Sequence, residues 1–320
     1  MRLLSATALI CLLAPVGFSQ NSKSAKDDPS KIGDRDIGKC LNFYPLDKEM
    51  ALGAELDREV QRQSKVVEDP LITEFINRMG QNLVRNSDAK FPFVFRVIQS
   101  DEVNAYTLPG GYVYVYTGLI KFAAEEDELA GAMAHEIAHA AARHLTCRAS
   151  KEQIAKIASV PLIFLGGLPG YAIRQGADAA LPMGLMAFSR HDESEADYLG
   201  LQYMYAAGYD PNGAVSMFEK LESLQKTRQG AVSRLFNSHP IEADRIDRTE
   251  KEIQKILPPR DNYVVTTSEF TGIRERLLRM DNGRKPTTDR PQLIRRNEDS
   301  PDKDQDSPRP TIKRKEFEEQ

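Results

Sequence analysis

The residues His135, Glu136 and His139 have the types and the spacing that metal-assisted hydrolysis requires. Positions i and i+4 of a helix project from the same face, so two imidazoles placed there can bind one metal ion. Glu136 would then lie beside the open side of that ion, where its carboxylate can take a proton from a water molecule. This pattern is typical of zinc hydrolases. The motif therefore predicts one Zn²⁺ per chain, with Glu136 as the general base.

The motif requires a helix, and the surrounding composition favours one. The stretch from Glu125 to Leu145 is rich in Ala, Glu and Leu and contains no Pro. Four acidic residues at its start, residues 125–128, complement the positive end of a helix dipole. We therefore expect one helix over residues 125–145. On that helix His144 would turn away from the face that carries His139, so we expect a structural or surface role for it.

Two histidines leave a catalytic zinc site incomplete, because such a site takes three protein ligands and one water. The chain has five histidines, and none stands at the spacing of a three-histidine metzincin signature. A carboxylate is the other option. Glu193 and Asp197 form an i, i+4 pair, so Glu193 would bind the metal and Asp197 would accept a hydrogen bond from a ligand histidine. The alternative is that this acidic stretch, Glu195 included, is simply a solvated helix face.

The two ends of the chain differ from its middle. Arg2, the apolar run Leu3–Val16 and small residues near Ser19 predict a secretory signal peptide over residues 1–19. The alternative, a membrane anchor, would need about 20 apolar residues. Residues 20–45 are polar and predict a linker or pro-segment. Residues 283–320 combine dense charge with five prolines and predict a disordered tail.

The region between these ends, residues 46–282, predicts a single catalytic domain. Its length suits one core, and the net charge of −4 argues against a nucleic-acid partner. We expect a mainly α fold with a small β-sheet (α+β), in which the motif helix packs beside the sheet. The expected helices cover residues 52–60, begin after Asp69, run from Ser189 to Ala207, and begin after Asp210. The expected strands cover residues 93–98, 104–108 and 112–116, with a turn at 109–111 and a last strand-to-helix element at 266–280.

Two features leave alternatives open. Cys40 and Cys147 remain after removal of a signal peptide and could pair in an oxidising compartment, whereas a free, buried Cys147 is the other reading. Residues 154–173 are almost uncharged and contain several Gly and Pro. We expect a buried helical hairpin there, with a peripheral membrane contact as the alternative.

Taken together, the motifs resemble the gluzincin endopeptidases that include the HtpX heat-shock proteases and the CAAX prenyl endopeptidases. The resemblance covers roughly Leu46 to Ile256. It is carried by His135-Glu136-x-x-His139, Glu193-x-x-Ala196-Asp197, Asn104-Ala105-Tyr106 with Pro109-Gly110-Gly111, Ser189-Arg190, and Ser238-His239-Pro240 followed by Arg245. The family implies a zincin-like domain in which His135, His139 and Glu193 hold Zn²⁺. It also implies Glu136 as the general base and Asp197 as a hydrogen-bond partner of a ligand histidine.

For His239 and Arg245 the resemblance implies a place near the cleft. Either residue could stabilise the negative charge that develops on the carbonyl oxygen. Alternatively, His239 fills the fourth zinc position in a resting state, or it merely caps the chain before Pro240.

The resemblance also implies what the protein acts on. The chain lacks the several clear spanning helices of the membrane members, so it resembles a soluble, exported branch, and we do not expect prenylated CAAX substrates. We expect a zinc endopeptidase that cleaves unfolded or misassembled proteins in the periplasm, in some cases at the membrane surface. The substrate would lie extended beside a strand formed by Val113, Tyr114 and Val115, with Asn104 nearby. The alternative is a chaperone-like assembly or quality-control factor of the envelope with latent protease activity.

Overall fold

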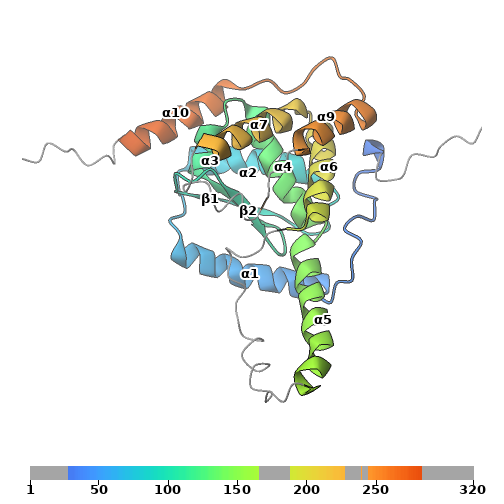
Figure 1. Ribbon diagram of the computed structural model, residues 1–320. Helices are drawn as coiled ribbons and strands as arrows, with labels where there is room; N and C mark the ends of the chain where they lie inside the picture. Colours follow the sequence, from blue (N-terminus) through green and yellow to red (C-terminus); the bar gives the residue numbers. More distant parts are fainter. Residues whose placement is uncertain (1–27, 166–187, 228–238, 240–243, 283–320) are drawn as a thin grey trace, which may run out of the picture.

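A computed structural model of the protein describes residues 28–165, 188–227, 239 and 244–282. Helices dominate this part of the chain, and one small sheet accompanies them, so the expected α+β class is confirmed (Figure 1). The elements are η2 (Pro29–Lys31), α1 (Leu46–Gln63), α2 (Pro70–Arg85), β1 (Val94–Ile98), β2 (Ala105–Leu108), β3 (Tyr112–Tyr116), α3 (Thr117–Phe122), α4 (Glu126–Ala141), α5 (His144–Leu165), α6 (Arg190–Ala206), α7 (Asn212–Thr227), α9 (Arg245–Ile256) and α10 (Ser268–Asn282).

The sheet has three strands in the order β1-β3-β2. The central strand β3 runs parallel to β1 and antiparallel to β2. The turn between β2 and β3 contains Gly110 and Gly111 at φ values of +73° and +88°, a conformation that residues with a Cβ rarely adopt. The three strands and this turn are confirmed as the sequence predicted them.

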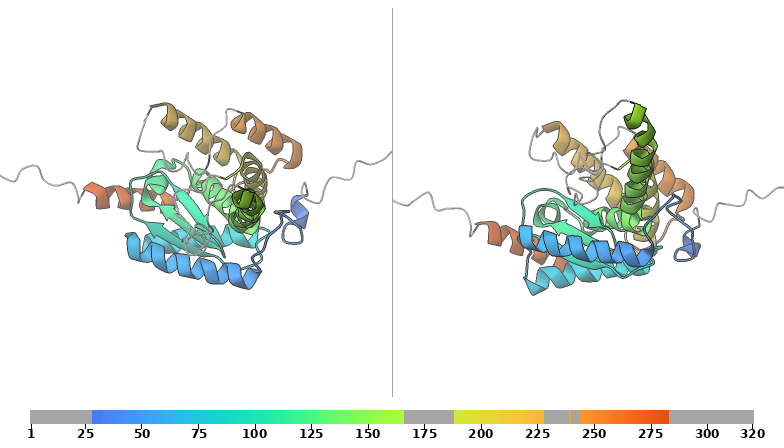
Figure 2. Two further views of the ribbon diagram at one scale, coloured as in Figure 1. Left: turned by 60° about the horizontal axis from the view of Figure 1, so that its bottom comes forward. Right: turned by 90° about the horizontal axis from the view of Figure 1, so that it is seen from below.

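The sheet lies between helix α1 and the main hydrophobic core. Its residues alternate between two faces: Tyr114 packs with Val60 of α1, whereas Val113 and Val115 pack into the core formed with α2 and α4. Figures 1 and 2 show α1 crossing one face of the sheet while α2 and α4 lie over the other. The motif helix α4 is therefore enclosed, with α6 and α7 on its remaining sides.

Local sequence explains where the neighbouring helices begin. The Asp69 side chain accepts a hydrogen bond from Leu71 N at the start of α2, where Pro70 opens the helix. Ser189 and Asp192 form a reciprocal capping box at the start of α6. The strand expected near residue 266 is absent from the described part of the chain, because Thr266 and Thr267 instead hydrogen-bond the acidic start of α4.

The expected single helix over 125–145 is wrong, because it consists of two helices. Helix α4 ends at Ala141, Arg143 adopts φ = +58°, and α5 begins at His144. A left-handed conformation costs a residue with a Cβ roughly 1–2 kcal/mol. Arg143 is held there by Nε, which donates to Glu49 Oε2 over 2.6 Å, and by Nη2, which donates to the Tyr44 carbonyl. These tertiary contacts, which the local composition does not reveal, redirect the chain after the motif.

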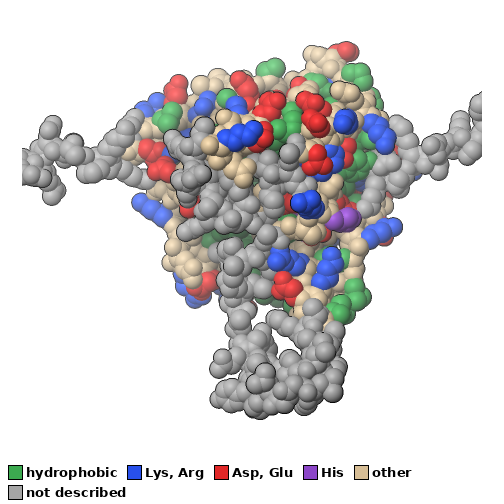
Figure 3. Space-filling view, viewed as in Figure 1, with side chains coloured by type: hydrophobic (Ala, Val, Ile, Leu, Met, Phe, Trp, Pro, Cys, Tyr) green, Lys and Arg blue, Asp and Glu red, His purple; other side chains and the backbone are tan. Residues whose placement is uncertain are grey.

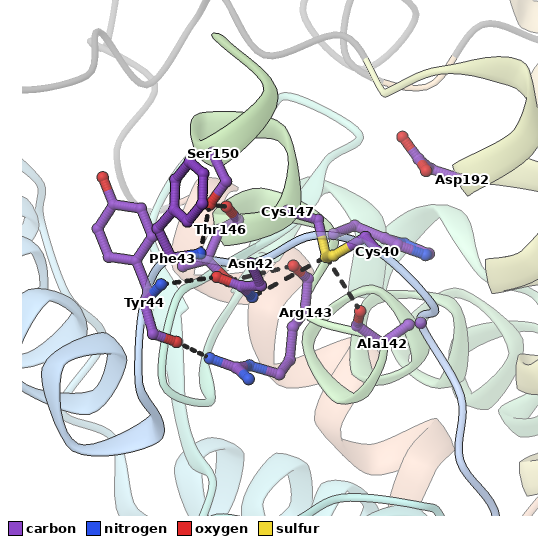
Figure 4. The surroundings of a disulfide bond; sticks show 12 residues. Cys40, Asn42, Phe43, Tyr44, Ala142, Arg143, Thr146, Cys147, Ser150 and Asp192 are labelled. Carbon is purple, nitrogen blue, oxygen red and sulfur yellow. Dashed lines mark hydrogen bonds between the residues drawn. A yellow bond between two sulfur atoms is a disulfide. The ribbon is translucent and has the colours of Figure 1, made fainter. Parts of the chain in front are cut away.

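Residues 28–45 pack against the domain, although the sequence predicted a linker before Leu46. The Arg35 side chain is buried, and its Nε lies 3.1 Å from both carboxylate oxygens of Asp88. Cys40 forms a disulfide bond with Cys147, which decides between the two readings of these cysteines (Figure 4). Polar composition suggested solvent exposure here, but a paired guanidinium can be buried.

Other expectations fall outside the described residues. These are the signal peptide at 1–19, the tail at 283–320 and the part of 154–173 that follows Leu165. Within the described ranges, no helix combines the length and the apolar character needed to cross a membrane. On the face seen in Figure 3, acidic and basic side chains are interspersed.

Candidate metal centre

Helices α4 and α6 lie side by side and bring three of the expected ligands together (Figure 1). His135 Nε2 lies 3.0 Å from His139 Nε2 and 3.5 Å from Glu193 Oε2. His139 Nε2 lies 3.4 Å from Glu193 Oε1. The two helices approach closely because α6 carries Gly200, where an added Cβ would lie 3.2 Å from His135 N. The i, i+4 spacing on α4 thus places both imidazoles opposite the first turn of α6.

His239 joins this group from the chain that follows α7. Its Nδ1 lies 2.9 Å from Glu193 Oε1 and 3.3 Å from His135 Nε2. One ligand atom from each of the four residues His135, His139, Glu193 and His239 lies within 4.8 Å of the others, and all four residues are buried. Three imidazole nitrogens and a carboxylate are the donor types that zinc prefers, and four is the usual number in a tetrahedral site.

The carboxylates of this centre support a fit to a metal ion. Oε2 of Glu136 is buried and finds no hydrogen-bond partner among the described residues, whereas Oε2 of Glu193 lies 3.3 Å from Arg245 Nη1. An isolated buried carboxylate oxygen is costly unless a cation or a donor compensates it. Burial raises the pKa of Glu193, but His239, His135 and His139 outweigh it and hold this pKa well below its usual range, so this ligand is ionised. The residues present therefore suit a divalent cation such as Zn²⁺.

Glu136 lies at the edge of the cluster. Its Oε1 is 3.3 Å from Nε2 of His239. Burial raises the pKa of Glu136, whereas His239, His135 and the main chain of Thr107 oppose that rise. A carboxylate with a raised pKa is a better proton acceptor than one in water.

Asp197 lies behind one of the histidines. Its Oδ1 is 2.9 Å from Nδ1 of His135, on the side of the ring that faces away from the cluster. Burial lowers the pKa of His135, but the hydrogen bonds with Asp197 and Glu193 outweigh it and raise this pKa to about 9. Despite burial, Arg245 holds the pKa of Asp197 below its ordinary value. This arrangement matches the supporting carboxylate that the sequence predicted for Asp197.

Arg245 is buried at the start of α9 and faces the same carboxylate. Its Nη2 and Nε donate to Asp197 Oδ1 and Oδ2 over 2.6 and 2.8 Å. Its Nη1 lies 3.3 Å from Glu193 Oε2, and its guanidinium stacks on Phe218 at 4.2 Å from the ring centre. Most of its donors are therefore directed at residues of the centre.

The expected substrate strand is wrong. Val113, Tyr114 and Val115 belong to the central strand β3, which pairs with β1 on one side and with β2 on the other. A strand with two neighbours has no main-chain groups left for a peptide. The order of the strands depends on a long-range parallel pairing with β1, which no local pattern reveals.

β2 is the strand near the site that pairs with one neighbour only among the described strands, so its other edge is unpaired by any of them. Tyr116 N donates to Asn104 O, so residues 104, 106 and 108 face β3 and the main chain of Ala105 and Thr107 faces outward. Asn104 itself is buried, and its Oδ1 has no hydrogen-bond partner. Because Thr107 also acts on the pKa of Glu136, this edge lies beside the candidate base.

A small apolar pocket lies next to Glu136, between β2, α4 and α7. Its volume is about 50 Å³. It is lined by Ala105, Ala132, Met217, Phe218 and Leu221 among others, and its floor includes His135 and Glu136.

Two residues of the centre were not expected from the sequence. His144 Nδ1 lies 2.9 Å from His139 Nδ1, and His144 Nε2 lies 3.4 Å from Glu195 Oε2. Of the structural and surface roles expected for His144, the contacts fit the structural one, but its ring returns to His139 because α5 begins in a new direction. The solvated face expected for Glu195 is wrong, because its carboxylate contacts the buried His144. Only the i, i+2 offset of Glu195 from Glu193 was visible in the sequence, and that spacing predicts opposite faces of a helix.

Comparisons with known proteins agree with this geometry. The family model described as Peptidase family M48 matches residues 70–253. A beta-barrel assembly-enhancing protease of Escherichia coli (strain K12) is 29% identical over 283 residues, which are 84% of this chain and 55% of that protein. A putative beta-barrel assembly-enhancing protease of Vibrio cholerae is 32% identical over 243 residues, or 73% of this chain and 50% of that protein.

A second group of relatives is mitochondrial, and it matches a smaller share of this chain. The metalloendopeptidase OMA1 of Schizosaccharomyces pombe is 33% identical over 192 residues, which are 59% of this chain and 55% of that protein. The chain thus spans about half the length of the curated relatives it matches.

Proposed function

The chain belongs to peptidase family M48, and from that premise we propose that it is a zinc-dependent endopeptidase. The observation that carries the proposal is the convergence of His135, His139 and Glu193 beside Glu136, whose Oε2 has no hydrogen-bond partner among the described residues. A structural zinc site would have no use for a buried, unsatisfied carboxylate next to its ligands. A hydrolytic site needs one as a base.

Each residue has a distinct part in the reaction. A zinc ion held by His135, His139 and Glu193 would polarise the scissile carbonyl and lower the pKa of a water molecule. Glu136 accepts the proton of that water and passes it to the leaving amine. Asp197 fixes the tautomer of His135, so that Nε2 is free to bind the metal. Arg245 holds Asp197 and Glu193 in place, and we assign it this positioning role on the basis of its contacts with both carboxylates.

The substrate binds as an extended strand against β2. Main-chain groups of Ala105 and Thr107 pair with the peptide, which gives affinity with little dependence on sequence. One side chain of the peptide enters the apolar pocket beside Glu136, and its volume of about 50 Å³ suits a small aliphatic group.

The substrates we propose are unfolded or misassembled proteins of the cell envelope. Support comes from the names of the relatives, which describe assembly enhancement of beta-barrels, and from the signal-peptide pattern at residues 1–19. The protein would accordingly act in the periplasm, with residues 154–173 as the candidate for a peripheral membrane contact. A main-chain binding mode suits such substrates, because it does not require a particular sequence.

A second candidate function, a chaperone-like assembly factor with latent protease activity, is favoured by one observation. His239 directs Nδ1 at the ligand cluster and Nε2 at Glu136. In this position it occupies the space that a water and the scissile carbonyl would need. The protein would then bind its clients with the centre closed.

The test of the main proposal is Glu136→Gln. This variant keeps the shape of the side chain and the three zinc ligands but cannot accept a proton. We expect full zinc content and loss of casein cleavage by several orders of magnitude, since the amide of Gln cannot accept the proton of the attacking water. Substantial cleavage by the zinc-loaded variant would contradict the assignment.

A further inference from the structure

The two metal-facing histidines of α4 are supported in different ways. His135 donates from Nδ1 directly to a carboxylate, that of Asp197. Within the part of the chain that the structure describes, no carboxylate contacts Nδ1 of His139, which instead lies 2.9 Å from Nδ1 of His144. Ligand histidines need a partner at the second ring nitrogen to fix their tautomer. His144 occupies that place for His139.

A second contact extends this arrangement to an acidic residue. Nε2 of His144 lies 3.4 Å from Oε2 of Glu195. Oε1 of Glu195 in turn accepts a hydrogen bond from Gly38 N over 3.3 Å. His144 is only 3% exposed, so water does not compete for its nitrogens. We call the chain of contacts His139–His144–Glu195 the relay.

The relay rests on our assignment of the metal centre, and we propose that His144 and Glu195 are positioning residues that fix the tautomer and ring orientation of His139. If Nε2 of His139 binds the metal, its Nδ1 carries the proton and donates to Nδ1 of His144. His144 must then carry its own proton on Nε2, where it donates to Glu195. A carboxylate can only accept hydrogen bonds. Glu195 therefore favours the one direction of hydrogen bonding along the relay in which Nε2 of His139 carries no proton and can bind the metal.

Several structural constraints hold the residues of the relay in this geometry. Arg143 takes up its left-handed conformation directly before His144, and that turn brings His144 back towards His139. Three residues later, Cys147 is tied by the disulfide to Cys40, two residues after Gly38 (Figure 4). Phe188 stacks on the face of the His139 ring with 3.8 Å between ring centres. The partners of the relay are therefore held from both ends.

The experiment measures zinc affinity by competition with a chromophoric chelator, independently of proteolysis. Asn and Leu have the same shape, but only Asn offers an acceptor near the position of Nδ1. We expect His144→Leu to weaken zinc binding by about 10- to 100-fold, and His144→Asn to restore most of it. His191→Leu is the matched control, because its side chain on α6 is 82% exposed, and it should bind zinc as the wild type does.

Spectra of the Co²⁺-substituted proteins provide the second readout. The ligand-field bands of His144→Leu should differ from those of the wild type, whereas those of His144→Asn should match it. Equal zinc affinity and equal spectra for His144→Leu and wild type would overturn the proposal. If His144→Leu does not fold, Glu195→Leu and Glu195→Gln replace it: weaker binding by the first alone supports the relay, and unchanged binding by both refutes it. Failure of the wild type to bind zinc would instead refute the proposed function itself.

Discussion

Nε2 of His239 lies 3.3 Å from Oε1 of Glu136, while Nδ1 of the same ring lies 2.9 Å from Glu193 Oε1. One imidazole thus contacts both the proposed base and the proposed third ligand. The proposal of a closed centre requires that a substrate displace this ring. We therefore favour a role for His239 in closing the site. The alternative role is that of a hydrogen-bond donor to the reacting oxygen.

His239→Ala tests this reading. Removal of the ring opens the space beside Glu136, so we expect casein cleavage to rise by about 10-fold, which corresponds to about 1.4 kcal/mol in the barrier. Zinc should stay bound, since His135, His139 and Glu193 remain. The double variant with Glu136→Gln is the control and should be inactive. A fall in the cleavage rate of His239→Ala would instead assign the ring to stabilisation of the transition state.

Arg245→Leu tests the support of the centre. It would leave the buried Asp197 without its two short hydrogen bonds and with His135 as its remaining close donor, and removing one partner of a buried ion pair typically costs about 3–5 kcal/mol. We expect a corresponding loss in the free energy of unfolding by urea, together with a lower zinc content. Arg279→Leu is the control, because its side chain is 68% exposed and its pair with Glu275 should contribute no more than about 1 kcal/mol. Equal stabilities of the two variants would argue against the positioning role of Arg245.

Asp127 should make stability depend on pH. Burial raises the pKa of this carboxyl to about 6, from 3.8, and its Oδ1 has no hydrogen-bond partner. The folded state therefore binds more protons than the unfolded state between these two pH values, and the stability that Asp127 contributes falls as pH rises through that window.

The corresponding variant is Asp127→Asn, which does not titrate. It should unfold at a higher temperature than wild type at pH 7.5, and the difference should shrink at pH 3.5. Asp47→Asn, at an exposed position in the first turn of α1, serves as the control and should show no such gain. A lower melting temperature of Asp127→Asn at pH 7.5 would mean that the charge is favourable at the start of α4.

The apolar pocket should set a preference for one substrate side chain. Ala132→Leu adds carbon atoms to a cavity of about 50 Å³ between α4 and α7. We expect kcat/KM for peptides with Leu at the pocket position to fall by about 10- to 200-fold, and that for peptides with Ala to change little. Ala124→Leu, at an exposed site just before α4, is the control. A uniform fall for both peptides would place the effect on the base and not on the pocket.

Much of the fold was accessible from local sequence because local rules determine it. The caps at Asp69 and Ser189 and the glycine turn at 109–111 each act over a few residues. The course of the chain after α4 was not accessible, because Arg143 is held by contacts with Glu49 and Tyr44, about 100 residues away in sequence. The burial of Arg35 was not predicted for the same reason, because it depends on a contact with the distant Asp88.

For the site, the sequence by itself determined the chemistry: the helical spacing of His135 and His139 and the carboxylate of Glu136 specify a metal and a base. The i, i+4 pair Glu193 and Asp197 marked the helix that completes them. Only the tertiary structure decided which strand edge pairs with no other described strand and how His239 faces the base. It also decided that His144 contacts Nδ1 of His139 and that Glu195 contacts His144. These relationships arise from packing between distant segments, and hydrogen bonds over such separations leave no period in the sequence.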